Sequence, residues 1–175
     1  MPFAKIYGRD LHYTDYASIS RSSTALSIVF VHGLGSTQNY YGPILPYLTN
    51  YRCITFDNYG AGRSKYYSEL HPDTSIEQIA DDVLDLMDYL QVGKAVVVGY
   101  SMGGMIPTTI AATNKGRDRI ISGVCIGPVH PTPQVAEVFK QRVKTVRDGK
   151  SDHVHFSILG GRQEEPPTVS SRARY

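Results

Sequence analysis

Three short apolar runs, each followed at once by a turn that contains glycine, constrain the fold of this 175-residue chain more than any other feature. They are residues 28–31, 53–56 and 95–98, and β-branched and aromatic side chains dominate them. Continuous apolar runs of this length are typical of strands buried on both faces, as in a parallel sheet with helices on either side. A fourth strand is predicted over residues 120–126, where a further mostly apolar run occurs.

Helical patterns separate these strands. Residues 75–92 carry apolar side chains at helical spacing, and Asp81, Asp82, Asp85 and Asp88 are assigned to the polar face of that helix. Thr74 and Ser75 both offer capping boxes at its start. A second helix is predicted over residues 102–113, with a kink at Pro107. A third is predicted from residue 132 to its stop at Gly149.

The first residues predict a hairpin of two short strands, 3–7 and 11–14, with residues 8–10 as the turn. Strands that alternate with helices then indicate an α/β fold with a mostly parallel sheet. We assign residues 1–149 to this domain. Residues 150–175 show little periodicity and are predicted to form a disordered tail outside the domain pattern.

Composition excludes several classes of function. The 18 basic and 16 acidic residues leave a net charge of +2, with no basic run, so we expect no nucleic-acid partner. Neither a membrane-spanning apolar run nor the apolar core of a secretory signal is present, which predicts a cytoplasmic protein without a membrane partner. Cys53 and Cys125 match no metal-ligand spacing and are expected to be reduced and buried. No metal or cofactor is expected.

The strongest chemical motif is Gly99-Tyr100-Ser101-Met102-Gly103, which follows one buried run and precedes a helix. This is the pattern of a nucleophile elbow, in which a serine sits on a tight strand-to-helix turn with its hydroxyl exposed. Side chains at Gly99 and Gly103 would collide with neighbouring backbone in such a turn. The alternative is a purely structural glycine-rich turn.

A second motif, His32-Gly33-Leu34-Gly35, follows the first buried run. Acyl transfer requires two N–H donors that converge on the developing oxyanion. The backbone N–H groups of Leu34 and Met102 are the candidates for this oxyanion hole. We interpret His32 as structural, because it stands directly before the turn.

Together with the loop at residues 57–64, these motifs resemble the α/β-hydrolase superfamily, and residues 83–106 are most similar to 3-oxoadipate enol-lactonases and related small esterases. The resemblance implies a doubly wound sheet whose first two strands form the hairpin. It also implies a hydrolase that acts on a small carboxylic ester or lactone, with Ser101 as its nucleophile. It also implies that Asp57, Gly60 and Gly62 shape the loop after the strand at 53–56, and that the two cysteines lie on non-neighbouring strands.

The resemblance leaves two parts of the expected catalytic triad unassigned. The family order is Ser, then Asp or Glu, then His, and the last two normally follow the last two strands of the sheet. This sequence predicts only four strands after the hairpin, so the sheet is expected to be incomplete. The remaining candidate bases and acids, none at the family position, are His130, His153, His155, Asp148 and Asp152.

Two hypotheses therefore stay open. The first is a serine hydrolase that forms an acyl-enzyme on Ser101. The second is a truncated hydrolase fragment that is catalytically incompetent, or a non-enzymatic binding module. The oligomeric state is open, and four tyrosines are candidates either for pocket walls or for packing: Tyr40, Tyr41, Tyr59 and Tyr100.

Overall fold

The computed structural model describes residues 2–19, 26–64, 74–130 and 132–148. Two compact units divide the chain, residues 1–129 and residues 130–175, and each is described by itself. The tail predicted over residues 150–175 lies outside the described residues. No helix in the described ranges combines the length and apolar character needed to cross a membrane.

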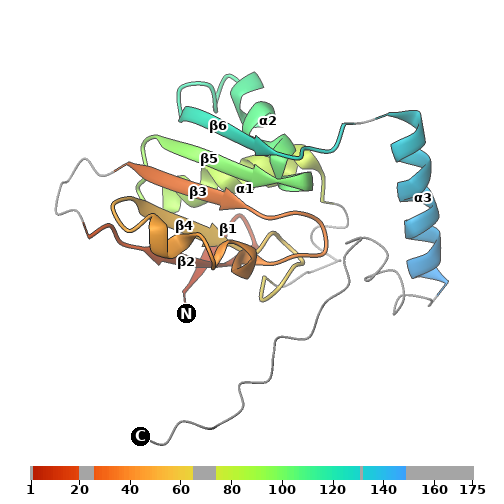
Figure 1. Ribbon diagram of the computed structural model, residues 1–175, viewed down its shortest axis with the longest axis horizontal. Helices are drawn as coiled ribbons and strands as arrows, with labels where there is room; N and C mark the ends of the chain where they lie inside the picture. The colour runs from red at the N-terminus through yellow and green to blue at the C-terminus, as the bar shows by residue number, and fades with distance from the viewer. Residues whose placement is uncertain (1, 20–25, 65–73, 131, 149–175) are drawn as a thin grey trace, which may run out of the picture. The chain divides into compact units, whose positions relative to one another are not determined.

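The first unit is built on one mixed sheet of six strands in the order β1-β2-β4-β3-β5-β6 (Figure 1). The first three strands in this order pair antiparallel, and β4, β3, β5 and β6 pair parallel. This arrangement confirms the predicted α/β fold class. The strands are β1 (Phe3–Ile6), β2 (Arg9–Tyr16), β3 (Ser27–Val31), β4 (Arg52–Phe56), β5 (Ala95–Tyr100) and β6 (Ile120–Ile126).

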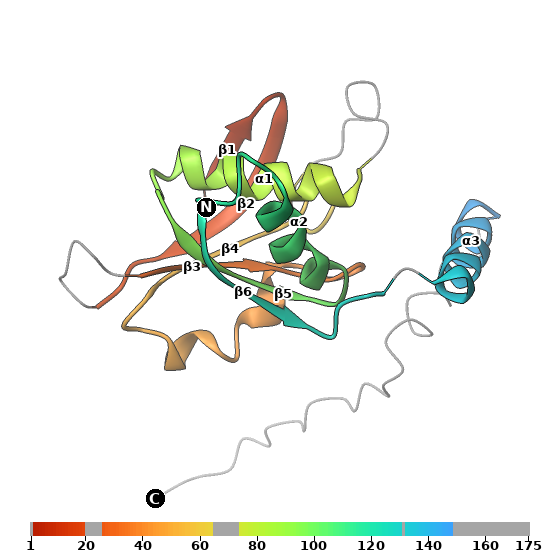
Figure 2. The ribbon, with the colours of Figure 1, turned by 90° about the horizontal axis from the view of Figure 1, so that it is seen from above.

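Helices cover both faces of the sheet. The helices α1 (Ile76–Tyr89) and α2 (Ile106–Ala112) lie on one face, and the short 3-10 helices η1 (Gln38–Tyr41) and η2 (Leu45–Tyr47) lie on the other (Figure 2). A third 3-10 helix, η3 (Ser101–Met105), follows β5 directly. In the second unit, α3 (Pro133–Arg147) is amphipathic, and its Val138 and Val143 are about half exposed.

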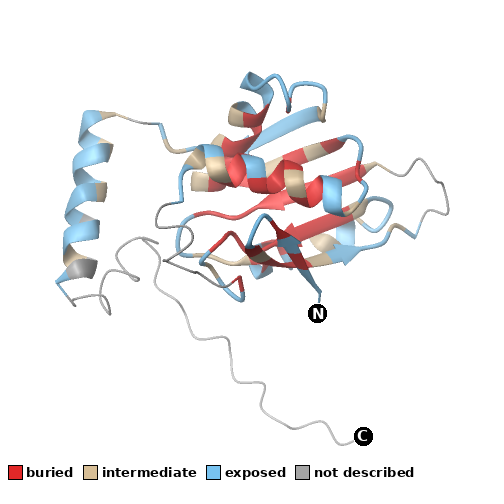
Figure 3. Ribbon diagram, turned by 180° about the vertical axis from the view of Figure 1, so that it is seen from behind, coloured by how far each residue is buried: buried red, intermediate tan, exposed pale blue. Residues whose placement is uncertain are grey.

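Burial is concentrated in the middle strands and on the inner face of α1 (Figure 3). The larger core lies between the sheet and the α1–α2 layer, and the smaller one lies beneath η1 and η2. β3 is buried along its whole length, as the continuous apolar run predicts. β6 is almost entirely exposed, because it is the last strand in the sheet order.

Two sequence predictions about local structure were wrong. The hairpin turn consists of Tyr7 and Gly8, not of residues 8–10, because both of these residues have positive φ and close a tight two-residue connection. Pro107 does not kink a helix that begins at residue 102. It occupies the first turn of α2, after η3, where its missing N–H leaves no hydrogen bond unmade.

Two predictions about burial were also wrong. Cys53 is buried as expected, but Cys125 is exposed, because β6 lacks a neighbour on its outer side in the described part of the chain. Both thiols are free and stand on non-neighbouring strands, β4 and β6. Asp82 is 1% exposed and not on the polar face of α1, because it pairs with Arg9 of the hairpin.

Candidate functional site

The three glycine-containing turns lie side by side at one edge of the sheet. Val31 of β3 is in register with Gly99 of β5, and Phe30 of β3 with Thr55 of β4. Because these strands are parallel, their carboxyl ends meet at the same edge. The turns that begin at His32, Asp57 and Tyr100 therefore start from three adjacent strand ends, with the His32 turn in the middle.

Ser101 is the first residue of η3, directly after β5, and its backbone is strained. Its φ is +54°, a left-handed conformation that is uncommon for a residue other than glycine. A side chain at Gly99 would collide with the carbonyl of Gly103, and one at Gly103 would collide with the carbonyl of Val31. Both glycines are therefore required by close backbone approach in this tight strand-to-helix turn.

The His32–Gly35 turn passes directly beside this serine. A Cβ atom placed on Gly33 would lie 3.1 Å from the Cβ of Ser101 and 3.2 Å from the carbonyl oxygen of Tyr100. Leu34 follows with its side chain 47% exposed, and Gly35 has a φ of +69°. The structure thus brings together the two turns from which the oxyanion donors are predicted to come.

The side chain of His32 hydrogen-bonds both to its own turn and to the turn after β4. Burial lowers the pKa of His32, and its two hydrogen bonds require one donor and one acceptor nitrogen, as in a neutral imidazole. Nδ1 lies 2.8 Å from the carbonyl oxygen of Gly33, to which it donates, and Nε2 accepts a hydrogen bond of 3.0 Å from the backbone N–H of Asn58. Both ring nitrogens are therefore used in joining the turns after β3 and β4.

Asp57 anchors the loop after β4. It is 2% exposed, and its carboxylate accepts hydrogen bonds from the backbone N–H groups of Gln38 (2.8 Å) and Arg63 (3.0 Å). Nδ1 of His12 lies 3.0 Å from the same carboxylate. Burial by itself would raise the pKa of Asp57, but these neighbours hold the pKa below its ordinary value. Asp57 is thus a charged, fully engaged support for the loop.

Two glycines of this loop are required by its backbone geometry. A side chain on Gly62, whose φ is +54°, would lie 2.5 Å from the Asp57 carboxylate. Gly60 also has a positive φ, of 80°. Sequence reasoning singled out these positions but missed His12 and Gln38, which reach Asp57 from distant parts of the chain and carry no local signal.

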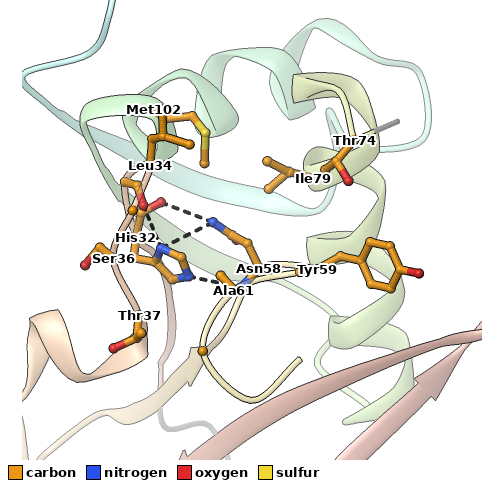
Figure 4. Close-up of a pocket in the computed structure, with 14 residues that line it drawn as sticks. His32, Leu34, Ser36, Thr37, Asn58, Tyr59, Ala61, Thr74, Ile79 and Met102 are labelled. Carbon is orange, nitrogen blue, oxygen red and sulfur yellow. Dashed lines mark hydrogen bonds between the residues drawn. The ribbon is translucent and has the colours of Figure 1, made fainter. Parts of the chain in front are cut away.

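A cavity of about 440 Å³ opens where these turns meet α1 (Figure 4). Leu34 and Met102 lie close together on one side of it, Ile79 comes from the first turn of α1, and Thr74 stands two residues before that helix. The segment from Asn58 to Gly62 forms another part of its wall. The pocket residues that sequence reasoning missed are Ser36, Thr37, Asn58, Ala61, Thr74 and Ile79.

The four candidate tyrosines have different places. Tyr41 is buried and donates to the carbonyl oxygen of Val31 at 2.8 Å, so it is a packing residue. Tyr40 is 48% exposed and stacks on Tyr100 with ring centroids 4.7 Å apart. Tyr59 contributes to the pocket wall while its ring is buried.

The candidate bases and acids remain unassigned. His130 and Asp148 are exposed residues of the second unit, and His153, His155 and Asp152 lie outside the described residues. Within the described ranges no histidine hydrogen-bonds to Ser101. No cluster of potential metal ligands is found among the described residues either.

Comparison with known proteins decides the family. The family model of the alpha/beta hydrolase fold matches residues 27–151, more than half of the chain. The chain belongs to the α/β-hydrolase fold family. The chain is 31% identical over 131 residues to the protein named "Putative carbamate hydrolase RutD" of Caulobacter vibrioides, a match that covers 73% of this chain and 47% of the relative.

Two further relatives bear on the site. Over 82 residues the chain is 33% identical to the "Karrikin insensitive 2 receptor CA" of Petunia hybrida, covering 46% of this chain and 30% of the receptor. The crystal structure of the enol-lactonase from Burkholderia xenovorans LB400 superposes with a TM-score of 0.78 at 30% identity, over 90% of this chain and 58% of the lactonase. The chain therefore spans about half the length of the carbamate hydrolase and of the lactonase it matches.

Proposed function

We propose that this chain carries the nucleophile and oxyanion half of a serine hydrolase site that acts on a small carboxylic ester or lactone. The observation that carries the proposal is the strained Ser101 turn, which is packed against the His32–Gly35 turn. Met102, the residue after Ser101, and residues 32–35 line the pocket. The relatives named as an enol-lactonase and a carbamate hydrolase support acyl transfer to water as the reaction type.

The proposed reaction has two steps, formation of an acyl-enzyme and its hydrolysis. In the first, Oγ of Ser101 bonds to the carbonyl carbon, the bond from that carbon to the leaving oxygen breaks, and the serine proton ends on the leaving oxygen. In the second, water attacks the acyl-enzyme, Ser101 regains its proton, and the carboxylic acid leaves. The N–H groups of Leu34 and Met102 are proposed to stabilise the oxyanion in both steps.

A non-enzymatic binding module is the second candidate. It is favoured by the commitment of His32 and His12 to structural hydrogen bonds, because a serine hydroxyl without an adjacent base is a poor nucleophile. The similarity to a protein named as a receptor also favours a binding module. In that case the pocket of about 440 Å³ would hold a small molecule without turning it over.

Hydrolysis of p-nitrophenyl acetate by the purified chain, compared with Ser101→Ala, separates the two candidates. The leaving group of this ester departs without protonation, so the assay detects the nucleophile even where a general acid is absent. Ser122→Ala is the matched control, because Ser122 is an exposed serine of β6. We expect a burst of p-nitrophenol that Ser101→Ala abolishes and Ser122→Ala leaves unchanged.

Equal release from wild type and Ser101→Ala, both folded by circular dichroism, would contradict the hydrolase proposal. Saturable heat release when a small lactone is titrated into the same inactive protein would then support the binding module.

A further inference from the structure

A buried arginine joins three parts of the first unit. Arg9, at the start of β2 and only 4% exposed, donates from Nη1 to both carboxylate oxygens of Asp82 on α1, at 3.1 and 3.0 Å. The central carbon of its guanidinium lies 4.8 Å from the ring centroid of Tyr59. The β1–β2 hairpin, α1 and the loop after β4 are therefore joined through the guanidinium of Arg9.

Tyr59 belongs to the part of that loop that lines the pocket, residues 58–62, which we call the wall segment. Gly60 and Gly62 in this segment are exposed and have no side chain that could anchor it. Tyr59 is 5% exposed, and its side chain extends away from His32 and Asn58 (Figure 4). The backbone of the segment thus faces the pocket while its largest side chain reaches the interior.

Stability alone does not account for a cation at this place. A buried ion pair is often no more stabilising than apolar side chains of the same volume, because both charges must leave water. The contact that apolar side chains do not reproduce is directional. A flat guanidinium held on one side by a carboxylate presents its face to an aromatic ring and is attracted to it.

We propose that Arg9 is a positioning residue for the pocket. Held by Asp82, its guanidinium supports the Tyr59 ring and so sets where the wall segment stands. Arg9 does not line the pocket, and its role does not depend on whether Ser101 is a nucleophile.

Amide hydrogen exchange, followed residue by residue by NMR at pH 7, tests this role without a substrate. The reporters are the amides of Asn58 and Ala61, which donate to His32 Nε2 at 3.0 Å and to the Asn58 carbonyl at 2.8 Å. The main variant is Arg9→Met combined with Asp82→Leu, which removes both charges and keeps apolar volume. We expect exchange at the two reporters to become about tenfold faster, because the buried cation–π contact is lost. Exchange within α1 should stay near the wild-type rate.

Two further variants complete the test. Arg9→Lys keeps the charge but loses the flat fork, so we expect about threefold faster exchange at the same reporters. If the double variant does not fold, the exchange rates of Arg9→Lys alone test the proposal. Arg52→Met is the matched control, because it removes a bidentate pair with Asp15 whose two side chains are 29% exposed, and it should leave the wall segment unchanged.

Exchange at Asn58 and Ala61 that stays at the wild-type rate in the Arg9 variants would overturn the proposal. Exchange that accelerates equally in the wall segment, in α1 and in the β1–β2 pair would also overturn it, because that result indicates general destabilisation.

Discussion

Single residues with buried charge decide how this fold responds to pH. Burial raises the pKa of Asp82 from its ordinary 3.8 to about 6, against the opposing attraction of Arg9. Gln78 and Asp85 of the same helix also act on the carboxyl, the first lowering and the second raising its pKa. The folded chain therefore binds this proton more tightly than the unfolded chain.

The sign of the effect follows from this difference. The contribution of Asp82 to stability is full below about pH 4 and is lost as the pH rises through about 6. A shift of about two units corresponds to roughly 3 kcal/mol. We expect urea unfolding of Asp82→Asn to lack this pH dependence, measured at several pH values from 4 to 8. Asp81→Asn, an exposed neighbour with the same charge change, should keep it; parallel curves for wild type and Asp82→Asn would contradict the assignment.

At the scale of elements, α1 is the helix on which the larger core and the pocket both depend. Ser75 is its N-cap, with Oγ accepting a hydrogen bond of 3.1 Å from the backbone N–H of Gln78. We expect Ser75→Ala to lower the free energy of unfolding by about 1 kcal/mol and the Tm by about 2–4 °C, measured by calorimetry. Thr74→Ala, at the competing cap position, is the control, and a loss as large as that of Ser75→Ala would refute the cap assignment.

At the scale of the whole sheet, the two edges differ. β1 is a four-residue strand that carries Lys5, whereas β6 has seven residues and no charge or proline. In the described part of the chain β6 pairs only with β5, and Ile121, Val124 and Ile126 are each more than 40% exposed. Unprotected apolar edges of this kind recruit further strands.

We therefore expect concentration-dependent self-association of the purified chain, detected by light scattering after size-exclusion chromatography. Val124→Lys should shift the population toward monomer, because a charge on the edge opposes pairing. Tyr47→Lys, at an 85% exposed position on η2, controls for the added charge. Association that is equally strong in both variants would exclude the β6 edge as its cause.

Much of the candidate site could be predicted because its signals are local. Gly99, Ser101 and Gly103 stand within five residues, and close backbone approach in one turn demands the two glycines. The support of that turn could not be predicted in the same way. Asp57 is held by His12 and Gln38, which lie 45 and 19 residues away in the chain, and neither position carries a periodicity or a motif.

Sequence by itself determined the fold class, the order of strands and helices, and the turns at which chemistry is proposed, because hydrophobic periodicity and glycine spacing act over a few residues. Only the tertiary structure decided which charges are buried. Asp82 stands at the border of the apolar face of α1, three residues after Ile79 and four before Leu86. A charge at such a border is buried here because it pairs with Arg9, 73 residues earlier in the chain. The same holds for Cys125, whose exposure depends on the place of β6 in the sheet order and not on the residues around it.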